Sequence, residues 1–176
     1  VHFPPGAFGQ NNLDVAEHIV EHVREQVPAG TRVAEFYAGV GAIGLSVLPR
    51  VNHLRINEVS PQSLQGLALG LDALAPAERN KIEVIPGTAG TMASAALDAD
   101  VVIADPPRKG LDRELVAQLV ADPPARFVYV SCGLDSFLAD TARLTSSGAL
   151  RLSDLRAFNL MPYTEHVETV ACFERA

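Results

Sequence analysis

Short apolar segments alternate with amphipathic helical segments along most of the chain, and this alternation limits the possible folds more than any other feature. The segments typical of strands are residues 32–37, 53–58, 81–85, 100–104 and 127–130. The segments with helical periodicity are residues 13–27, 60–74, 112–120 and 135–144. Strands and helices in this order predict a mostly parallel sheet that is covered by helices on both faces.

Two further strand-like segments, residues 150–159 and 167–174, follow each other without a helix between them. We therefore expect an α/β fold with a seven-stranded sheet whose last strand is antiparallel. A chain of 176 residues is long enough for one domain with a substantial core. In open sheets of this kind, ligands bind beyond the carboxyl ends of the strands. The segments expected to meet there are residues 35–41, Glu58, residues 105–108 and residues 131–132.

Charge and cysteine content narrow the class of protein. The net charge of −7 argues against a free-standing nucleic-acid binder, because such domains are usually basic. Cys132 and Cys172 are too few for a disulfide framework or a zinc site, so we expect a cytoplasmic protein without a metal. No apolar run is long enough to cross a membrane, and no signal peptide is recognisable. Because the chain does not begin with Met, we expect it to be part of a longer protein.

The glycine-rich segment 35-EFYAGVGAIG-44 follows the first predicted strand. Its G-x-G-x-x-G pattern lets the backbone approach a ligand at a helix N-terminus, although the pattern alone fits a dinucleotide, S-adenosylmethionine or a plain tight turn. Glu35 favours S-adenosylmethionine, since a carboxylate repels a pyrophosphate and attracts a cationic methionine group. Glu58, at the end of the second strand, is suited to accept hydrogen bonds from ribose hydroxyls.

The segment 105-DPPRKGLD-112 follows the fourth predicted strand. Its two prolines end the strand pairing and stiffen the loop, so that Asp105 is held in place to orient a planar base. The simpler interpretation is a strand terminator followed by a helix cap at Asp112, and the segment alone favours neither.

Cys132 lies between the fifth predicted strand and the next helix, in 129-YVSCGLD-135. A thiol becomes a nucleophile as the thiolate, and a helix N-terminus lowers its pKa. The alternative is a small buried hydrophobic residue, which is the interpretation that we give to Cys172.

Near the end of the chain, Glu168 enters the last strand two residues after His166. Glu168 is either a general base or a solvent-facing strand residue.

Together these segments resemble one family, the S-adenosylmethionine-dependent RNA uracil methyltransferases that make 5-methyluridine in tRNA and ribosomal RNA. The motifs occur in the family's order, namely F-x-Q at 8–10, E-F-Y-A-G-V-G at 35–41, Glu58, D-P-P-R-x-G-L-D at 105–112, V-S-C at 130–132 and H-V-E at 166–168. The resemblance covers nearly the whole chain. It implies a Rossmann-like class I methyltransferase fold in which residues 1–176 form the C-terminal catalytic domain, without the family's N-terminal RNA-binding segments.

The resemblance also implies a role for each candidate residue. Cys132 attacks carbon 6 of the target uracil, Glu168 removes the proton from carbon 5, and Asp105 with Gln10 holds the polar edge of the base. The cofactor S-adenosylmethionine is held by Gln10, Glu35, Tyr37, Gly39, Gly41, Glu58 and Asp105. The expected partner is tRNA or rRNA, bound weakly by this chain alone, with no membrane and no metal.

Two family features are missing. Residues 84–90 contain no acidic residue to contact the adenine, and residues 67–74 lack an asparagine that the family often has.

Three other functions stay open. The DPP loop is shared with amino-group methyltransferases, although Arg108 stands where they need an aromatic residue. A domain that binds the cofactor without turnover and a nicotinamide-dependent oxidoreductase are the others.

Overall fold

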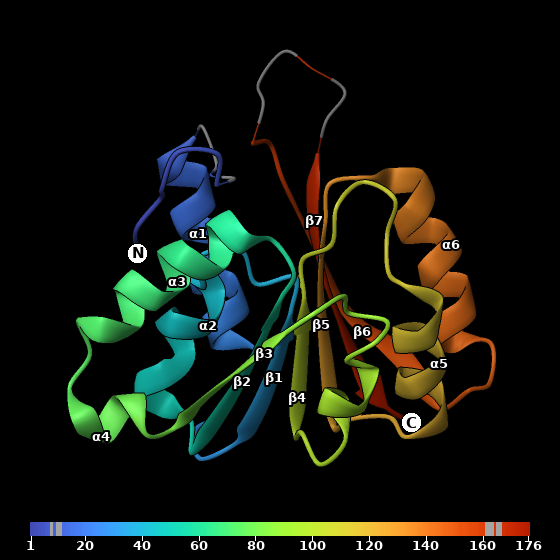
Figure 1. Ribbon diagram of the computed structural model, residues 1–176. Coiled ribbons are helices and arrows are strands. Elements are labelled where there is room, and N and C mark those ends of the chain that lie inside the picture. The colour runs from blue at the N-terminus through green and yellow to red at the C-terminus, as the bar shows by residue number, and fades with distance from the viewer. Residues whose placement is uncertain (8, 10–11, 161–163, 165–166) are drawn as a thin grey trace.

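The computed structural model describes residues 1–7, 9, 12–160, 164 and 167–176. Its centre is a seven-stranded sheet in the order β3-β2-β1-β4-β5-β7-β6 (Figure 1). The strands are β1 (Arg32–Phe36), β2 (His53–Glu58), β3 (Ile82–Pro86), β4 (Val101–Ala104), β5 (Arg126–Ser131), β6 (Leu150–Phe158) and β7 (Glu168–Arg175). Strands β1 to β5 pair in parallel, and β7 is antiparallel to both β5 and β6. This confirms the predicted α/β sheet and its antiparallel last strand.

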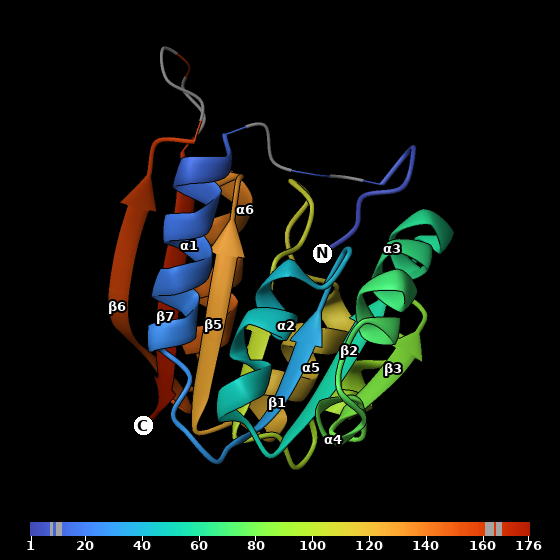
Figure 2. The same ribbon diagram turned by 90° about the vertical axis from the view of Figure 1, so that its left-hand side faces the viewer.

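Helices cover both faces of the sheet. They are α1 (Leu13–Glu25), α2 (Ala42–Val47), α3 (Pro61–Asp72), α4 (Pro76–Arg79), α5 (Arg113–Ala121) and α6 (Leu134–Thr145), with the short 3-10 helices η1 (Leu48–Arg50) and η2 (Ala93–Ala96). Helices α1, α2 and α3 lie on one face, and α5 and α6 lie on the other (Figure 1). In Figure 2, α1 stands in front of β5 and β7, against which its apolar side packs.

The core has two layers because the central strands are apolar on both sides. In β4, Val101 and Ile103 pack towards α1 and α2, whereas Val102 and Ala104 pack towards α5 and α6. All four side chains are almost completely buried. A continuous apolar run in the sequence is what a strand buried on both faces requires. Parallel pairing of β1 with β4 and of β4 with β5 places the carboxyl ends of these three strands side by side.

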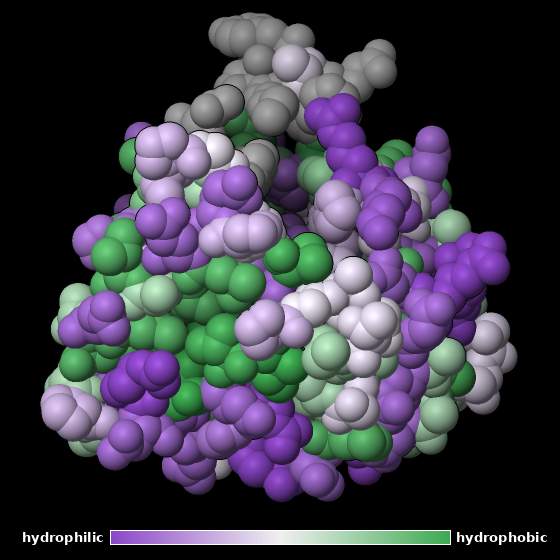
Figure 3. Space-filling model, viewed as in Figure 1, coloured by the Kyte–Doolittle hydropathy of each residue, from purple (hydrophilic) through white to green (hydrophobic). Residues whose placement is uncertain are grey.

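The structure also contains features that periodicity did not predict. The short helices α4, η1 and η2 have too few turns to give a periodic signal. Between β3 and β4 only η2 forms, so no long helix covers that part of the sheet. Strand β3 is an outer strand, and hydrophobic surface gathers between it and α3 on the face shown in Figure 3.

Candidate active site

Strand pairing brings Cys132 and Glu168 together. Ser131, the last residue of β5, pairs with Thr169 in the antiparallel β7. The hydroxyl of Thr169 also donates a hydrogen bond to the carbonyl oxygen of Ser131, at 3.2 Å. Continuing this register by one residue sets Cys132 opposite Glu168 at the end of the sheet. Cys132 is half-buried and Glu168 is buried, so the interpretation of Glu168 as a solvent-facing strand residue is wrong.

The loop after β4 (residues 105–112) packs against the segment that carries Cys132. Asp105 directly follows β4, with its amide 3.4 Å from the carbonyl oxygen of Phe36. At Gly133, an added methyl group would lie 2.9 Å from the carbonyl oxygen of Arg108. At Gly110, where φ is +82°, the same atom would lie 3.0 Å from Cβ of Ser136 in α6. The two glycines therefore allow the loop to lie directly on the first turn of α6.

The surroundings of Cys132 keep its thiol protonated. Burial raises the pKa of Cys132, the negative charges of Glu168 and Asp105 raise it further, and the positive charge of Arg108 lowers it. Cys132 does precede the helix α6, as predicted. The expectation that this position gives a lowered pKa is nevertheless wrong for the structure, because burial and two carboxylates outweigh the helix N-terminus.

The two carboxyl groups beside the thiol influence each other. Burial raises the pKa of Asp105 to about 7, and the charge of Glu168 adds to this shift. Burial also raises the pKa of Glu168, while Arg108 opposes the rise. A carboxyl group with a pKa near neutrality can both accept and release a proton at the working pH. The site therefore combines a thiol, one guanidinium and two carboxyl groups of raised pKa, of which Asp105 has a pKa near neutrality.

The loop after β1 has the backbone conformation that its glycines allow. Gly39 and Gly41 have φ values of +59° and +82°, and Gly41 forms the N-terminal boundary of α2. A methyl group added at Gly39 would meet no atom within 4 Å, so there is open space in front of this residue. Tyr37 also has a positive φ, of 59°, which is uncommon for a residue with a side chain.

Glu35 is buried beneath this loop. Its Oε1 accepts a hydrogen bond from the amide of Gly44 at 3.0 Å, and its Oε2 is buried without a hydrogen-bond partner. Burial raises the pKa of Glu35 to about 8, and the charges of Asp105 and Glu58 contribute. The expected carboxylate is therefore protonated at neutral pH in the structure, because the charged form would lack solvation. A cationic group near Oε2 would favour the charged form.

Glu58 is tied to the backbone around it. Its Oε2 accepts a hydrogen bond from Gly39 at 2.7 Å, and its Oε1 accepts from Val59 and Ser60 at 2.8 Å and 2.7 Å. A carboxylate has about four acceptor positions, so one position on Oε2 remains for a ligand hydroxyl. Glu58 thus connects the end of β2 to the glycine loop of β1.

Two anchoring contacts were not predicted from the sequence, one made by Asp140 and one by Tyr37. Asp140 of α6 is buried, and its Oδ2 accepts hydrogen bonds from the amide of Leu111 and the hydroxyl of Tyr129, both at 2.9 Å. The hydroxyl of Tyr37 accepts a hydrogen bond from the amide of Asp112, also at 2.9 Å. An aspartate on the apolar side of α6 was the only signal for the first of these contacts.

Asp112 lies at the start of α5, but its side chain does not cap the helix. Its side chain makes no hydrogen bond to the first turn, and its Oδ2 instead accepts from the amide of Gly90, at 3.0 Å. Its Oδ1 lies 3.0 Å from Nζ of Lys109. Asp112 therefore occupies the N-cap position of α5, as the simpler interpretation expected, while its side chain joins the loops that follow β3 and β4.

Two residues with predicted roles, Gln10 and His166, lie outside the described residues.

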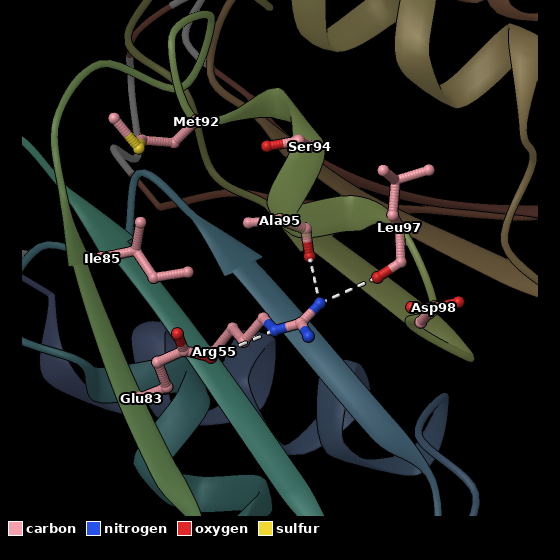
Figure 4. Close-up of a pocket in the computed structure, with 8 residues that line it drawn as sticks. All are labelled: Arg55, Glu83, Ile85, Met92, Ser94, Ala95, Leu97 and Asp98. Atoms are coloured by element: carbon pink, nitrogen blue, oxygen red, sulfur yellow. Dashed lines mark hydrogen bonds and ion pairs between the residues drawn. The ribbon is translucent and has the colours of Figure 1, made fainter.

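A separate pocket of about 340 Å³ lies over β2 and β3, beside η2 (Figure 4). There Arg55 donates hydrogen bonds to Glu83 and to the carbonyl oxygens of Ala95 and Leu97. The residues that line this pocket include none of the described site residues.

In the part of the chain that the structure describes, no helix is long and apolar enough to cross a membrane. Among the same described residues, no group of three or more His, Cys, Asp or Glu side chains could hold a metal ion.

Comparison with known proteins gives consistent matches. Residues 91–176 match the family model described as tRNA (uracil-5-)-methyltransferase. An uncharacterized RNA methyltransferase of Protochlamydia amoebophila is 37% identical over 98% of this chain, and one of Lactococcus lactis is 33% identical over 96%. The chain spans only 45% and 37% of the length of these two relatives.

Solved structures agree with this similarity. The tRNA (uracil-54, C5)-methyltransferase of Pyrococcus abyssi, in complex with S-adenosyl-L-homocysteine, superposes with a TM-score of 0.83 at 28% identity. The match covers 96% of this chain and 40% of that one. The precorrin-6y C5,15-methyltransferase of Geobacter metallireducens superposes with a TM-score of 0.69 at 12% identity, over 90% of this chain and 88% of that one, which shows the shared fold alone.

Proposed function

Because residues 91–176 match the tRNA (uracil-5-)-methyltransferase family model, we propose that the chain transfers a methyl group from S-adenosylmethionine to carbon 5 of a uridine in tRNA or rRNA. The observation that carries this proposal is the meeting of Cys132, Asp105 and Glu168 at one end of the sheet, where their charges affect one another. A thiol beside two carboxyl groups of raised pKa suits addition to a pyrimidine ring followed by proton removal.

The described residues fit the cofactor. The buried, unpartnered Oε2 of Glu35 suits the cationic methionine end, and the open space before Gly39 leaves room for the ligand. The remaining acceptor position of Glu58 suits a ribose hydroxyl. Tyr37 and Gly41 shape this loop, and Gln10 stays a predicted contact. The bound cofactor supplies an electrophilic methyl group.

The protein's own residues supply the remaining chemistry. The thiol of Cys132 gives its proton to Asp105, and the thiolate adds to carbon 6 of the uracil, which makes carbon 5 nucleophilic. After carbon 5 has taken the methyl group, Glu168 removes the proton from carbon 5. The bond between carbon 6 and sulfur then breaks, the thiolate of Cys132 regains its proton from Asp105, and Glu168 releases the carbon 5 proton to water. The target base has to leave its stack to reach the thiol.

Neighbouring charges favour this function over the nicotinamide alternative. Glu35, Glu58 and Asp105 lie close enough for their charges to interact. A cationic cofactor would favour the charged forms of these carboxyl groups, whereas a pyrophosphate would be repelled by them. We further propose that RNA is the partner and that this chain is the catalytic domain of a longer protein. A cytoplasmic location stays a prediction.

The test is transfer of a labelled methyl group from S-adenosylmethionine to tRNA and rRNA transcripts, followed by digestion and mass spectrometry of the nucleosides. We expect label in 5-methyluridine with the unmodified chain and with Cys172→Ala, which removes the buried thiol of β7. We expect none with Cys132→Ala. Label on another base or on ribose would contradict the proposal, as would a cofactor-bound chain that methylates no uridine at high RNA concentration.

A further inference from the structure

The loop of residues 105–112 is held by side chains that the proposed reaction does not use. It bears Asp105 and Arg108, whose charges act on Cys132. The amides of Leu111 and Asp112 are consecutive, and each donates to a side-chain oxygen from a different part of the fold. Leu111 is bound by Asp140, 29 positions later in the chain, and Asp112 by Tyr37, 75 positions earlier.

Asp140 is the central anchor. It is only 2% exposed, and one oxygen, Oδ2, accepts from both Leu111 and Tyr129. The backbone at Gly110 packs tightly against this side chain, since a methyl group on Gly110 would overlap Oδ2 of Asp140. The other oxygen, Oδ1, lies 3.2 Å from Nη1 of Arg143, which is half exposed. The buried Oδ2 contacts should therefore matter more than this surface ion pair.

From these contacts we infer that Asp140 is a positioning residue, which sets the loop of Asp105 and Arg108 at the correct place over Cys132. Asp140 lies in the second turn of α6, which begins two residues after Cys132, and the loop lies on the first turn of the same helix. Helix α6 therefore carries Asp140, which anchors the loop. The same helix begins next to Cys132, whose thiol the loop faces. The inference rests on the proposed function for its catalytic consequence and on the structure alone for the anchoring contact.

Three variants separate this role from general stability. Asp140→Ala removes both acceptor contacts. Asp140→Asn keeps one acceptor oxygen at the Oδ2 position and loses the charge and the surface ion pair of Oδ1 with Arg143, so it is the conservative rescue of the buried contacts. Leu144→Ala, one turn further along α6, removes a fully buried side chain and leaves the loop contacts intact, so it controls for loss of stability.

The first measurement is amide hydrogen exchange at Leu111 in the full chain. We expect exchange about tenfold faster in Asp140→Ala, equivalent to about 1.4 kcal/mol of lost protection. Exchange at Leu111 in Asp140→Asn should be within about twofold of the unmodified chain. Leu144→Ala should not expose Leu111 selectively. Unchanged exchange in Asp140→Ala, at equal global stability, would overturn the anchoring contact.

The second measurement is the rate at which Cys132 forms an adduct with RNA containing 5-fluorouridine, at saturating S-adenosylmethionine. We expect Asp140→Ala to slow this rate at least about tenfold at saturating RNA, and Asp140→Asn to restore it. An unchanged rate beside faster exchange would overturn the positioning role. If the unmodified chain forms no adduct, the proposed function fails instead, and the exchange comparison still decides whether Asp140 holds the loop.

Discussion

Each carboxyl group at the carboxyl end of the sheet has its own environment. Glu58 is satisfied by three backbone amides, whereas one oxygen of Glu35 is buried without a partner. Burial raises the pKa of Glu35 to about 8 and that of Asp105 to about 7. The surroundings therefore give these carboxyl groups different roles. Glu58 supports the backbone, whereas Glu35 and Asp105 have raised pKa values that suit proton exchange.

Glu35→Gln should remove a pH dependence of folding. Between its ordinary pKa of 4.5 and about 8, Glu35 keeps in the folded protein a proton that the unfolded chain has released. Stability therefore falls as pH rises through this window, by at most about 1.4 kcal/mol per pH unit. Urea unfolding should show that Glu35→Gln loses less stability than the unmodified chain between about pH 5 and about pH 8. Asp105 titrates in both proteins, so the difference between them reports Glu35 together with its interaction with Asp105. Equal losses would contradict the assignment.

Glu168→Gln should make Cys132 more reactive. The negative charge of Glu168 raises the pKa of the thiol, so its removal increases the thiolate fraction at neutral pH. The rate of alkylation by iodoacetamide, followed for the Cys132 peptide by mass spectrometry over a range of pH, should rise and its midpoint should move to lower pH. Cys172 is buried and serves as an internal reference. A midpoint that stays or moves to higher pH would contradict the account.

At the scale of elements, the contact between α2 and β1 depends on a glycine. Gly44 of α2 lies against Glu35 of β1, and a methyl group there would overlap Oε2 of Glu35. Gly70 of α3 is also a buried helix residue, but its added methyl group would lie 3.4 Å from the flexible end of Leu45. Replacing glycine by alanine changes the helix propensity equally at Gly44 and Gly70, but the added methyl group meets different neighbours at the two positions.

Gly44→Ala should destabilise the protein by about 1–3 kcal/mol, because the added methyl group forces α2 away from β1. Gly70→Ala is the matched control and should be neutral or stabilising by up to about 1 kcal/mol, since alanine is the better helix former. Thermal unfolding of both variants checks this. If the two substitutions changed stability alike, helix propensity rather than packing would dominate at both positions.

Much of the arrangement of elements follows from the sequence. The apolar run Val101–Ala104 predicted a strand buried on both faces, and the missing helix before β7 predicted its direction. Boundaries were less accurate. The first helix was expected to continue to residue 27 and ends at Glu25. Helix ends depend on local capping contacts, which periodicity does not report.

The candidate site was predicted in position but not in its state. Residues at the carboxyl ends of neighbouring parallel strands have to lie close together, which is why Asp105 and Cys132 were expected near each other. Charge states and anchors depend on contacts between distant parts of the chain. The pKa of Cys132 and the contact of Asp140 with Leu111 both arise this way, so no local pattern contained them.

At the scale of the whole molecule, charge sets the expected behaviour towards RNA. The net charge of −7 gives little long-range attraction for phosphates. The chain also spans less than half the length of the two relatives described above. We therefore expect weak RNA binding by this chain alone, with a shallow dependence on salt because few phosphate contacts release counterions. Fluorescence anisotropy with labelled tRNA at two salt concentrations tests this, and tight, strongly salt-dependent binding would contradict it.

The central claim is that Cys132 attacks a uracil in RNA. The most direct measurement mixes the chain with S-adenosylmethionine and a short RNA that carries 5-fluorouridine, and determines the intact mass of the protein. Glu168 cannot remove fluorine from carbon 5, so the reaction should stop at a covalent adduct. The account predicts an adduct on Cys132 that is absent in Cys132→Ala and present in Cys172→Ala. An adduct that persists in Cys132→Ala, or no adduct from a chain that binds both cofactor and RNA, would contradict it.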